Sequence, residues 1–99
     1  MAAKLVLIAY GSGLDPDVAE VVRASGAVGY TRWERATGAG RSSGTHLDTR
    51  VWPDFNHVSA VVADEATAAR IMAGIRELRK SEGARGVKAF VLPVEEVTE

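Results

Sequence analysis

The chain has 99 residues, of which 46% are hydrophobic and 25% are charged, so it is long enough for one hydrophobic core and too short for two. Its 12 basic and 13 acidic residues give a formal net charge of -1, which excludes a strong sequence-independent attraction to nucleic acid or to anionic membranes. The absence of cysteine excludes disulfides and thiolate chemistry, and the apolar run near the start is far too short to cross a bilayer. We therefore expect a single cytoplasmic domain covering residues 1–99.

The first half of the chain predicts a strand, a helix and a second strand. The continuous apolar run over residues 5–10 is typical of a strand buried on both faces, and it ends at the glycine turn of residues 11–13. Asp15 followed by Pro16 predicts the start of a helix with Asp15 as its N-cap, and valines at helical spacing continue until Gly26. Residues 28–37 mix apolar and polar side chains in a pattern typical of a strand with one wetter face.

The second half predicts another strand, helix and strand. Residues 55–63 resume strand character, and Asp64 is the expected N-cap of a helix. The apolar residues of that helix recur at helical spacing: Ala68, Ile71, Met72, Ile75 and Leu78. Residues 83–86 form the exit turn, and residues 87–94 form the fourth strand, whose end Pro93 confines to a sheet edge or a bend.

This order of elements predicts the α+β class and the ferredoxin-like βαββαβ fold, an antiparallel sheet with two helices on one face. Two helices cover only one face of a four-stranded sheet, yet the first and fourth strands are apolar on both faces. We therefore expect the second face to be buried by another copy of the chain.

Three stretches of the sequence resemble the PII signal-transduction proteins: residues 29–31 (GYT), residues 38–44 (GAGRSSG) and residues 88–97 (KAFVLPVEEV). In that family a G-x-G-R stretch opens the long T-loop between the second and third strands, and a lysine followed by F-V-x-P-V-E-x-V forms the fourth strand. Both motifs match here in order and position. The resemblance implies a T-loop at about residues 38–54 and a homotrimer with small-molecule sites in the clefts between subunits.

The resemblance also implies a regulatory function. It implies a protein that is not an enzyme, that binds a small anionic effector, with an adenine nucleotide as the candidate, and that controls a partner such as a membrane transporter through the T-loop. Neither nucleic-acid binding nor direct membrane insertion is implied. The residues that match effector-binding positions of the family are Thr31, Gly38, Gly40, Arg41, Gly44 and Lys88.

The chemistry of these residues fits an anion site and also fits simpler roles. Glycines let backbone N–H groups approach an anion, and the guanidinium of Arg41 forks onto phosphate or carboxylate. From the residues alone, the glycines equally fit a loop that needs positive φ, and Arg41 and Lys88 equally fit solvated cations. Thr31 equally fits an ordinary strand threonine.

The sequence departs from the PII pattern at three points. Ser42 stands where these proteins usually have a glutamine that helps to hold magnesium and an oxo-acid. The loop is shorter and lacks the tyrosine-bearing tip, so uridylylation is not expected. Glu95, Glu96 and Glu99 follow the fourth strand in place of the basic C-loop that grips nucleotide phosphates.

Two alternatives come from other classes of protein. A CutA-like metal-binding trimer would share the fold and use His46 or His57 with Asp48 and Asp54, because imidazole and carboxylate suit first-row metals. Two histidines without fixed helical spacing are a weak signal for a metal site, however, and they equally fit surface histidines or hydrogen bonds that anchor the loop. A small ferredoxin-like enzyme, such as an isomerase or a monooxygenase, would need a pocket between sheet and helices and would form a dimer, and the sequence holds no recognisable nucleophile setting.

Overall fold

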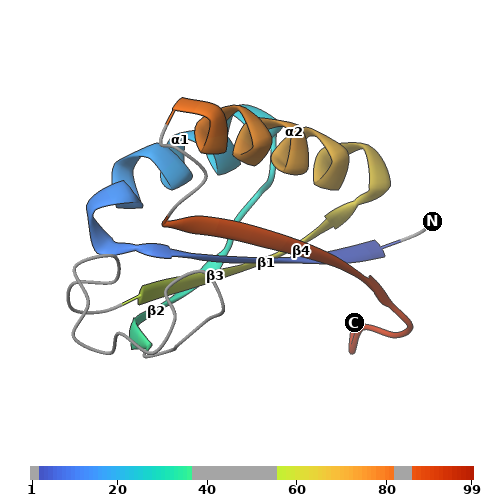
Figure 1. Cartoon of the computed structure of the whole chain (residues 1–99). Helices are drawn as coiled ribbons and strands as arrows, with labels where there is room; N and C mark the ends of the chain where they lie inside the picture. The colour runs from blue at the N-terminus through green and yellow to red at the C-terminus, as the bar shows by residue number, and fades with distance from the viewer. Residues whose placement is uncertain (1–2, 37–55, 82–85) are drawn as a thin grey trace.

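The computed structural model describes residues 3–36, 56–81 and 86–99, which form a four-stranded sheet with two helices on one face (Figure 1). The elements in chain order are β1 (Ala3–Gly11), the short 3-10 helix η1 (Ser12–Leu14), α1 (Asp15–Ser25), β2 (Thr31–Ala36), β3 (Asn56–Asp64), α2 (Glu65–Ser81) and β4 (Val87–Val94). This is the predicted βαββαβ order, so the predicted ferredoxin-like fold class is confirmed.

The strands lie in the order β2-β3-β1-β4, and each neighbouring pair is antiparallel. The two central strands are therefore β3 and β1, and the two edges are β2 and β4. Pro93 lies in the edge strand β4, as predicted, because proline has no backbone N–H to donate and an edge strand is hydrogen-bonded on one side only.

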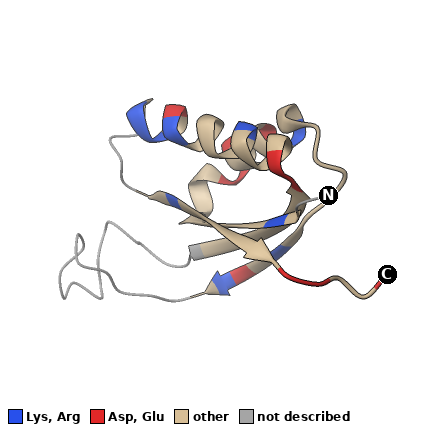
Figure 2. Ribbon diagram, turned by 90° about the vertical axis from the view of Figure 1, so that its right-hand side faces the viewer, with Lys and Arg blue, Asp and Glu red and all other residues tan. Residues whose placement is uncertain are grey.

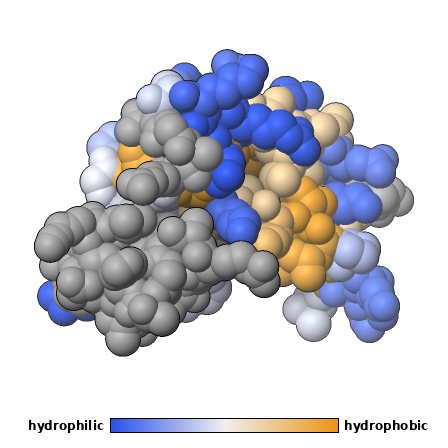
Figure 3. Space-filling view, in the orientation of Figure 1, coloured by the Kyte–Doolittle hydropathy of each residue, from blue (hydrophilic) through white to orange (hydrophobic). Residues whose placement is uncertain are grey.

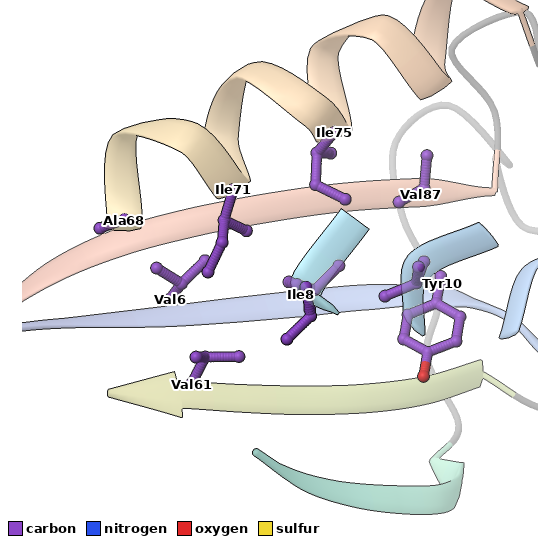
Figure 4. Packing of buried hydrophobic residues seen from close by; sticks show 10 residues of the cluster. Val6, Ile8, Tyr10, Val61, Ala68, Ile71, Ile75 and Val87 are labelled. Atoms are coloured by element: carbon purple, nitrogen blue, oxygen red, sulfur yellow. The ribbon is translucent and has the colours of Figure 1, made fainter. Parts of the chain in front are cut away.

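The hydrophobic core lies between the sheet and the helices (Figure 4). Side chains of a strand alternate between its faces, so Val6, Ile8 and Tyr10 of β1 all point toward the helices, and each is no more than 1% exposed. The helices and the neighbouring strands complete this core with Val18, Val22, Val61, Ala68, Ile71, Ile75 and Val87. Burial of an aliphatic side chain of this size stabilises the fold by about 1.5–3 kcal/mol, so this layer holds the helices on the sheet.

The two helices begin differently from one another. The Thr67 backbone N–H donates a hydrogen bond of 2.7 Å to Asp64 Oδ1, so Asp64 caps α2 as predicted. The prediction that Asp15 caps α1 is wrong, because Leu14 occupies the N-cap position and makes no side-chain cap hydrogen bond. Asp15 is the first residue of α1, and its carboxylate binds side chains of the strands instead.

The second strand is shorter than predicted. β2 begins at Thr31, not at residue 28, and Val28 is fully exposed in the stretch that follows the left-handed C-cap Gly26. The alternation that suggested a longer strand is therefore not accompanied by ladder pairing before Thr31. Among the described residues, no helix is long and apolar enough to cross a membrane.

Close packing of the two helices depends on Gly74 of α2. A Cβ atom added at Gly74 would lie 2.7 Å from Val21 Cγ1, and the β-branched Val21 has little freedom to move away. Alanine is intrinsically the better helix former by about 1 kcal/mol, but overpacking of this kind costs about 1–3 kcal/mol.

We therefore expect Gly74→Ala to lower the free energy of unfolding, measured by urea titration. In a Val21→Ala background, which removes the opposing methyl groups, the same substitution should be neutral or stabilising. An increase in stability for Gly74→Ala alone would contradict the proposed clash.

Candidate functional site

The face of the sheet opposite the helices is apolar, and we call it the open face. Direct partners in an antiparallel sheet share a face, so the side chains of β1 that alternate with the core residues lie beside matching residues of β3 and β4. The apolar residues of the open face are Leu5, Leu7, Ala9, Trp33, Val58, Ala60, Val62, Phe90 and Leu92. In the single chain Trp33, Val62 and Phe90 are each about half exposed, and Figure 3 shows hydrophobic side chains gathered where β4 runs. Such a patch is characteristic of an interaction surface.

Two of the predicted site residues, Thr31 and Lys88, lie on this open face. Thr31 of β2 pairs with Ala60, and Lys88 of β4 pairs with Ala9, so both side chains share the face of these two alanines. The Lys88 ammonium also lies 5.9 Å from the centre of the Phe90 ring, within reach of a cation–π attraction.

The same topology keeps Thr31 and Lys88 apart within one chain. They lie on opposite edge strands with β3 and β1 between them. At a spacing of about 4.8 Å between neighbouring strands, roughly 14 Å of sheet separates them. A single chain therefore does not bring these two side chains onto one small anion.

The remaining predicted residues, Gly38, Gly40, Arg41 and Gly44, lie outside the described residues, as does His46. The described part of the chain does fix the two points between which they run. Ala36 at the end of β2 pairs with Asn56 at the start of β3, so the predicted T-loop leaves and rejoins the sheet at one end.

That same end of the sheet carries the start of β4. The Gly11 N–H donates a hydrogen bond of 2.8 Å to the Gly86 carbonyl oxygen, and Arg79 of α2 donates through Nη1 to the carbonyl oxygen of Val87. Gly86 has a φ of 81°, which favours glycine. These contacts fix the backbone next to Lys88. Figure 2 shows further Lys and Arg residues in the last turn of α2, on the helix side of the sheet.

A polar cluster that was not predicted from the sequence lies on the helix side of the same end. Asp15 Oδ1 accepts a hydrogen bond of 2.8 Å from the Tyr10 hydroxyl and lies 3.4 Å from His57 Nδ1, while Asp15 Oδ2 accepts one of 2.6 Å from Arg32 Nη1. The Tyr10 hydroxyl also lies 3.1 Å from Ser59 Oγ. We call these five residues the Asp15 cluster. No local motif signals it, because its members come from β1, α1, β2 and β3.

The charges of the Asp15 cluster support one another. Burial by itself would raise the pKa of Asp15, but the hydrogen bonds from Tyr10 and His57 and the positive charge of Arg32 lower it below its ordinary value of 3.8. Burial raises the pKa of Tyr10 to about 12, so its hydroxyl keeps the proton that it donates to Asp15. The carboxylate is therefore ionised and held from three sides.

The described residues give the metal-binding alternative no ligand set. Among them, no group of three His, Asp or Glu side chains lies close enough to hold a metal ion. His57 is engaged with Asp15 and packs its ring edge to face with Tyr10, with the ring centres 5.5 Å apart. The other candidate ligands, His46, Asp48 and Asp54, lie outside the described residues.

The comparison with known proteins places this fold in a class of small regulatory proteins. The family model "Nitrogen regulatory protein P-II" matches residues 3–99. The chain therefore belongs to the P-II nitrogen regulatory protein family, as the sequence resemblance predicted. No curated protein matches the chain significantly.

Solved structures give the same result. A proposed PII-like signaling protein from Thermus thermophilus, TTHA0516, is 29% identical with a TM-score of 0.69, over 95% of this chain and 87% of that one. CPII from Thiomonas intermedia K12, bound to ADP and bicarbonate, is 16% identical with a TM-score of 0.74, over 95% of this chain and 87% of that one. CPII bound to ADP, AMP and acetate is 16% identical with a TM-score of 0.70, over 96% and 90% of the two chains. The likeness to CPII is one of fold.

The lowered pKa of Asp15 predicts a specific loss of stability in acid. Because the folded protein holds this carboxyl ionised at a pH where the unfolded chain begins to protonate it, the unfolded state binds more protons. The stabilisation is thus present above the ordinary pKa and is lost as the pH falls through the folded one.

We expect the difference in unfolding free energy between the wild type and Asp15→Asn to shrink as the pH falls from about 5 toward about 3. Urea titrations of both proteins at each pH measure this difference. A difference that stays the same across that range would contradict the ionised cluster.

Proposed function

We propose that this protein is a PII-like regulatory homotrimer that binds an adenine nucleotide in the clefts between subunits. It acts as a binding protein, not as an enzyme, and controls a partner protein through residues 38–54. The observation that carries the proposal is the position of Thr31 and Lys88 on one apolar face, at its two opposite edges.

A cyclic assembly explains this position. A heterologous interface that closes into a ring brings different edges of neighbouring copies together. If the open face is buried in such a ring, the β2 edge of one copy approaches the β4 edge of the next. Thr31 then borders the same cleft as the partner subunit's Lys88, although the two are far apart within one chain.

The chemistry of the cleft suits a phosphorylated ligand. Lys88 supplies a positive charge at the start of β4, where a phosphate is favoured. In the proposed site Gly38, Gly40, Arg41 and Gly44 supply backbone N–H groups and a guanidinium. The choice of an adenine nucleotide is supported by CPII, whose structures hold ADP and AMP. Binding would act on the partner by shifting a population of conformations, not by chemistry.

The nucleotide site is tested by calorimetry with ADP and with AMP on three proteins. We expect Lys88→Ala to weaken ADP binding at least about 10-fold, because it removes a charge-assisted contact worth about 1.4 kcal/mol or more. Lys80→Ala is the matched control, since Lys80 is an exposed lysine of α2 paired with Glu77. Equal affinities in all three proteins, or no binding by the wild type, would contradict the proposed site.

The assembly is tested separately by light scattering. Phe90 lies on the open face, where it pairs with Leu7 from the β4 edge, so Phe90→Asp places a charge in the proposed interface and should convert a trimer to monomers. Val28→Asp is the control, because Val28 is fully exposed and lies outside the sheet. A wild-type dimer would instead favour the small-enzyme alternative.

A further inference from the structure

The edge strand β2 is less firmly built into the chain than the other strands. Its residues are exposed in the single chain except Ala36, which is half-buried. Its pairing with β3 is regular only from Thr31 to Trp33, and a bulge interrupts it before Ala36. Within that bulge Arg35 has a φ of 64°, in the left-handed region that non-glycine residues rarely adopt.

An ion pair connects β2 to the body of the protein on the helix side. Arg32 pairs in register with the buried Ser59, and its Nη1 donates to Asp15 Oδ2 at 2.6 Å. The Arg32 and Asp15 side chains are 32% and 29% exposed, so solvent screens this pair less than a fully exposed one. Within β2 the second nitrogen of Arg32 donates to Glu34 Oε2 at 2.8 Å.

The two members of this pair are not equally free to move. Asp15 lies in the first turn of α1, and the buried Tyr10 hydroxyl and His57 hold its other oxygen. Arg32 lies on the exposed, irregular strand. The carboxylate is therefore the more firmly held member of the pair, and Arg32 is the member on the less regular element.

We propose that the Asp15–Arg32 ion pair is a latch that holds β2 docked on the sheet, so that breaking it opens the β2–β3 ladder while the β1–β3 and β1–β4 ladders stay closed. This makes β2 a local unit with a lower opening free energy than the rest of the sheet. The closed latch corresponds to the described structure.

If the proposed nucleotide site is correct, the latch also controls whether Thr31 faces that site. Thr31 is the neighbour of Arg32 and lies on the opposite face of β2, so Thr31 faces the cleft only while β2 is docked. Apparent affinity for a ligand falls in proportion to the fraction of protein in the binding-competent state. The strength of the latch would therefore set the affinity of the cleft without touching the ligand.

Hydrogen exchange of backbone amides, followed by NMR on the full chain without nucleotide, tests the latch. In Arg32→Gln we expect the amides of β2 and their partners on β3 to exchange at least about 10-fold faster, with amides of the β1–β4 ladder unchanged. Arg32→Lys keeps a positive charge and should recover part of the protection. Arg23→Gln is the matched control, because it removes an exposed ion pair with Glu20 on α1.

Salt provides a second readout, which separates the charge of Arg32 from the packing of its side chain. In the wild type, about 1 M NaCl shortens the Debye length to about 3 Å and should speed exchange in β2, whereas Arg32→Gln should show no such response. Exchange in Arg32→Gln equal to that in Arg23→Gln, or acceleration across the whole sheet, would overturn the latch. Because no nucleotide is present, failure of ADP binding would leave this result intact, and failure of the latch would leave Lys88-dependent binding intact.

Discussion

A four-stranded sheet that is apolar on both faces has to be covered twice, and this chain supplies helices for one face. On β1 the requirement is visible residue by residue, because Val6 and Ile8 are buried under the helices while Leu5 and Leu7 lie on the open face. The covered side holds the chain together, and the open side requires a partner surface. The proposed assembly therefore depends on the same alternation that builds the core.

The Asp15 cluster forms because the last core residue of β1 is a tyrosine. The buried row of β1 finishes with Tyr10, whose ring fills the core while its hydroxyl needs hydrogen-bond partners (Figure 4). Asp15 and Ser59 supply those partners, and the charge placed there in turn engages Arg32 and His57. One buried hydroxyl thus gathers α1, β2 and β3 at the end of the sheet where the predicted T-loop begins and ends.

Local patterns in the sequence were sufficient to predict most of the fold, but they did not predict the Asp15 cluster. The α2 cap at Asp64, the edge position of Pro93 and the two-sided apolar strands depend on neighbouring residues, so they were predicted. Asp15 precedes a proline, as many helix N-caps do. Its carboxylate instead accepts hydrogen bonds from Tyr10 and Arg32, which are distant in the sequence, so the local pattern predicted the wrong role. Residues 10 and 57 are brought together only by the β1–β3 register, which no local pattern specifies. The family resemblance supplied Thr31 and Lys88 but not their separation within one chain.

The two sides of the proposed cleft are built with different rigidity, and this difference suits regulation. On the β4 side, the Gly11–Gly86 hydrogen bond and the Arg79 contact to the Val87 carbonyl fix the backbone next to Lys88. On the β2 side, a short interrupted ladder and the partly exposed Asp15–Arg32 ion pair contact the strand that bears Thr31. A ligand that contacts both sides would meet a fixed charge from one subunit and an adjustable strand from its neighbour. Part of its binding energy would then order β2, which is followed in the chain by residues 37–55. A ligand that contacts only the Lys88 side would bind without ordering β2.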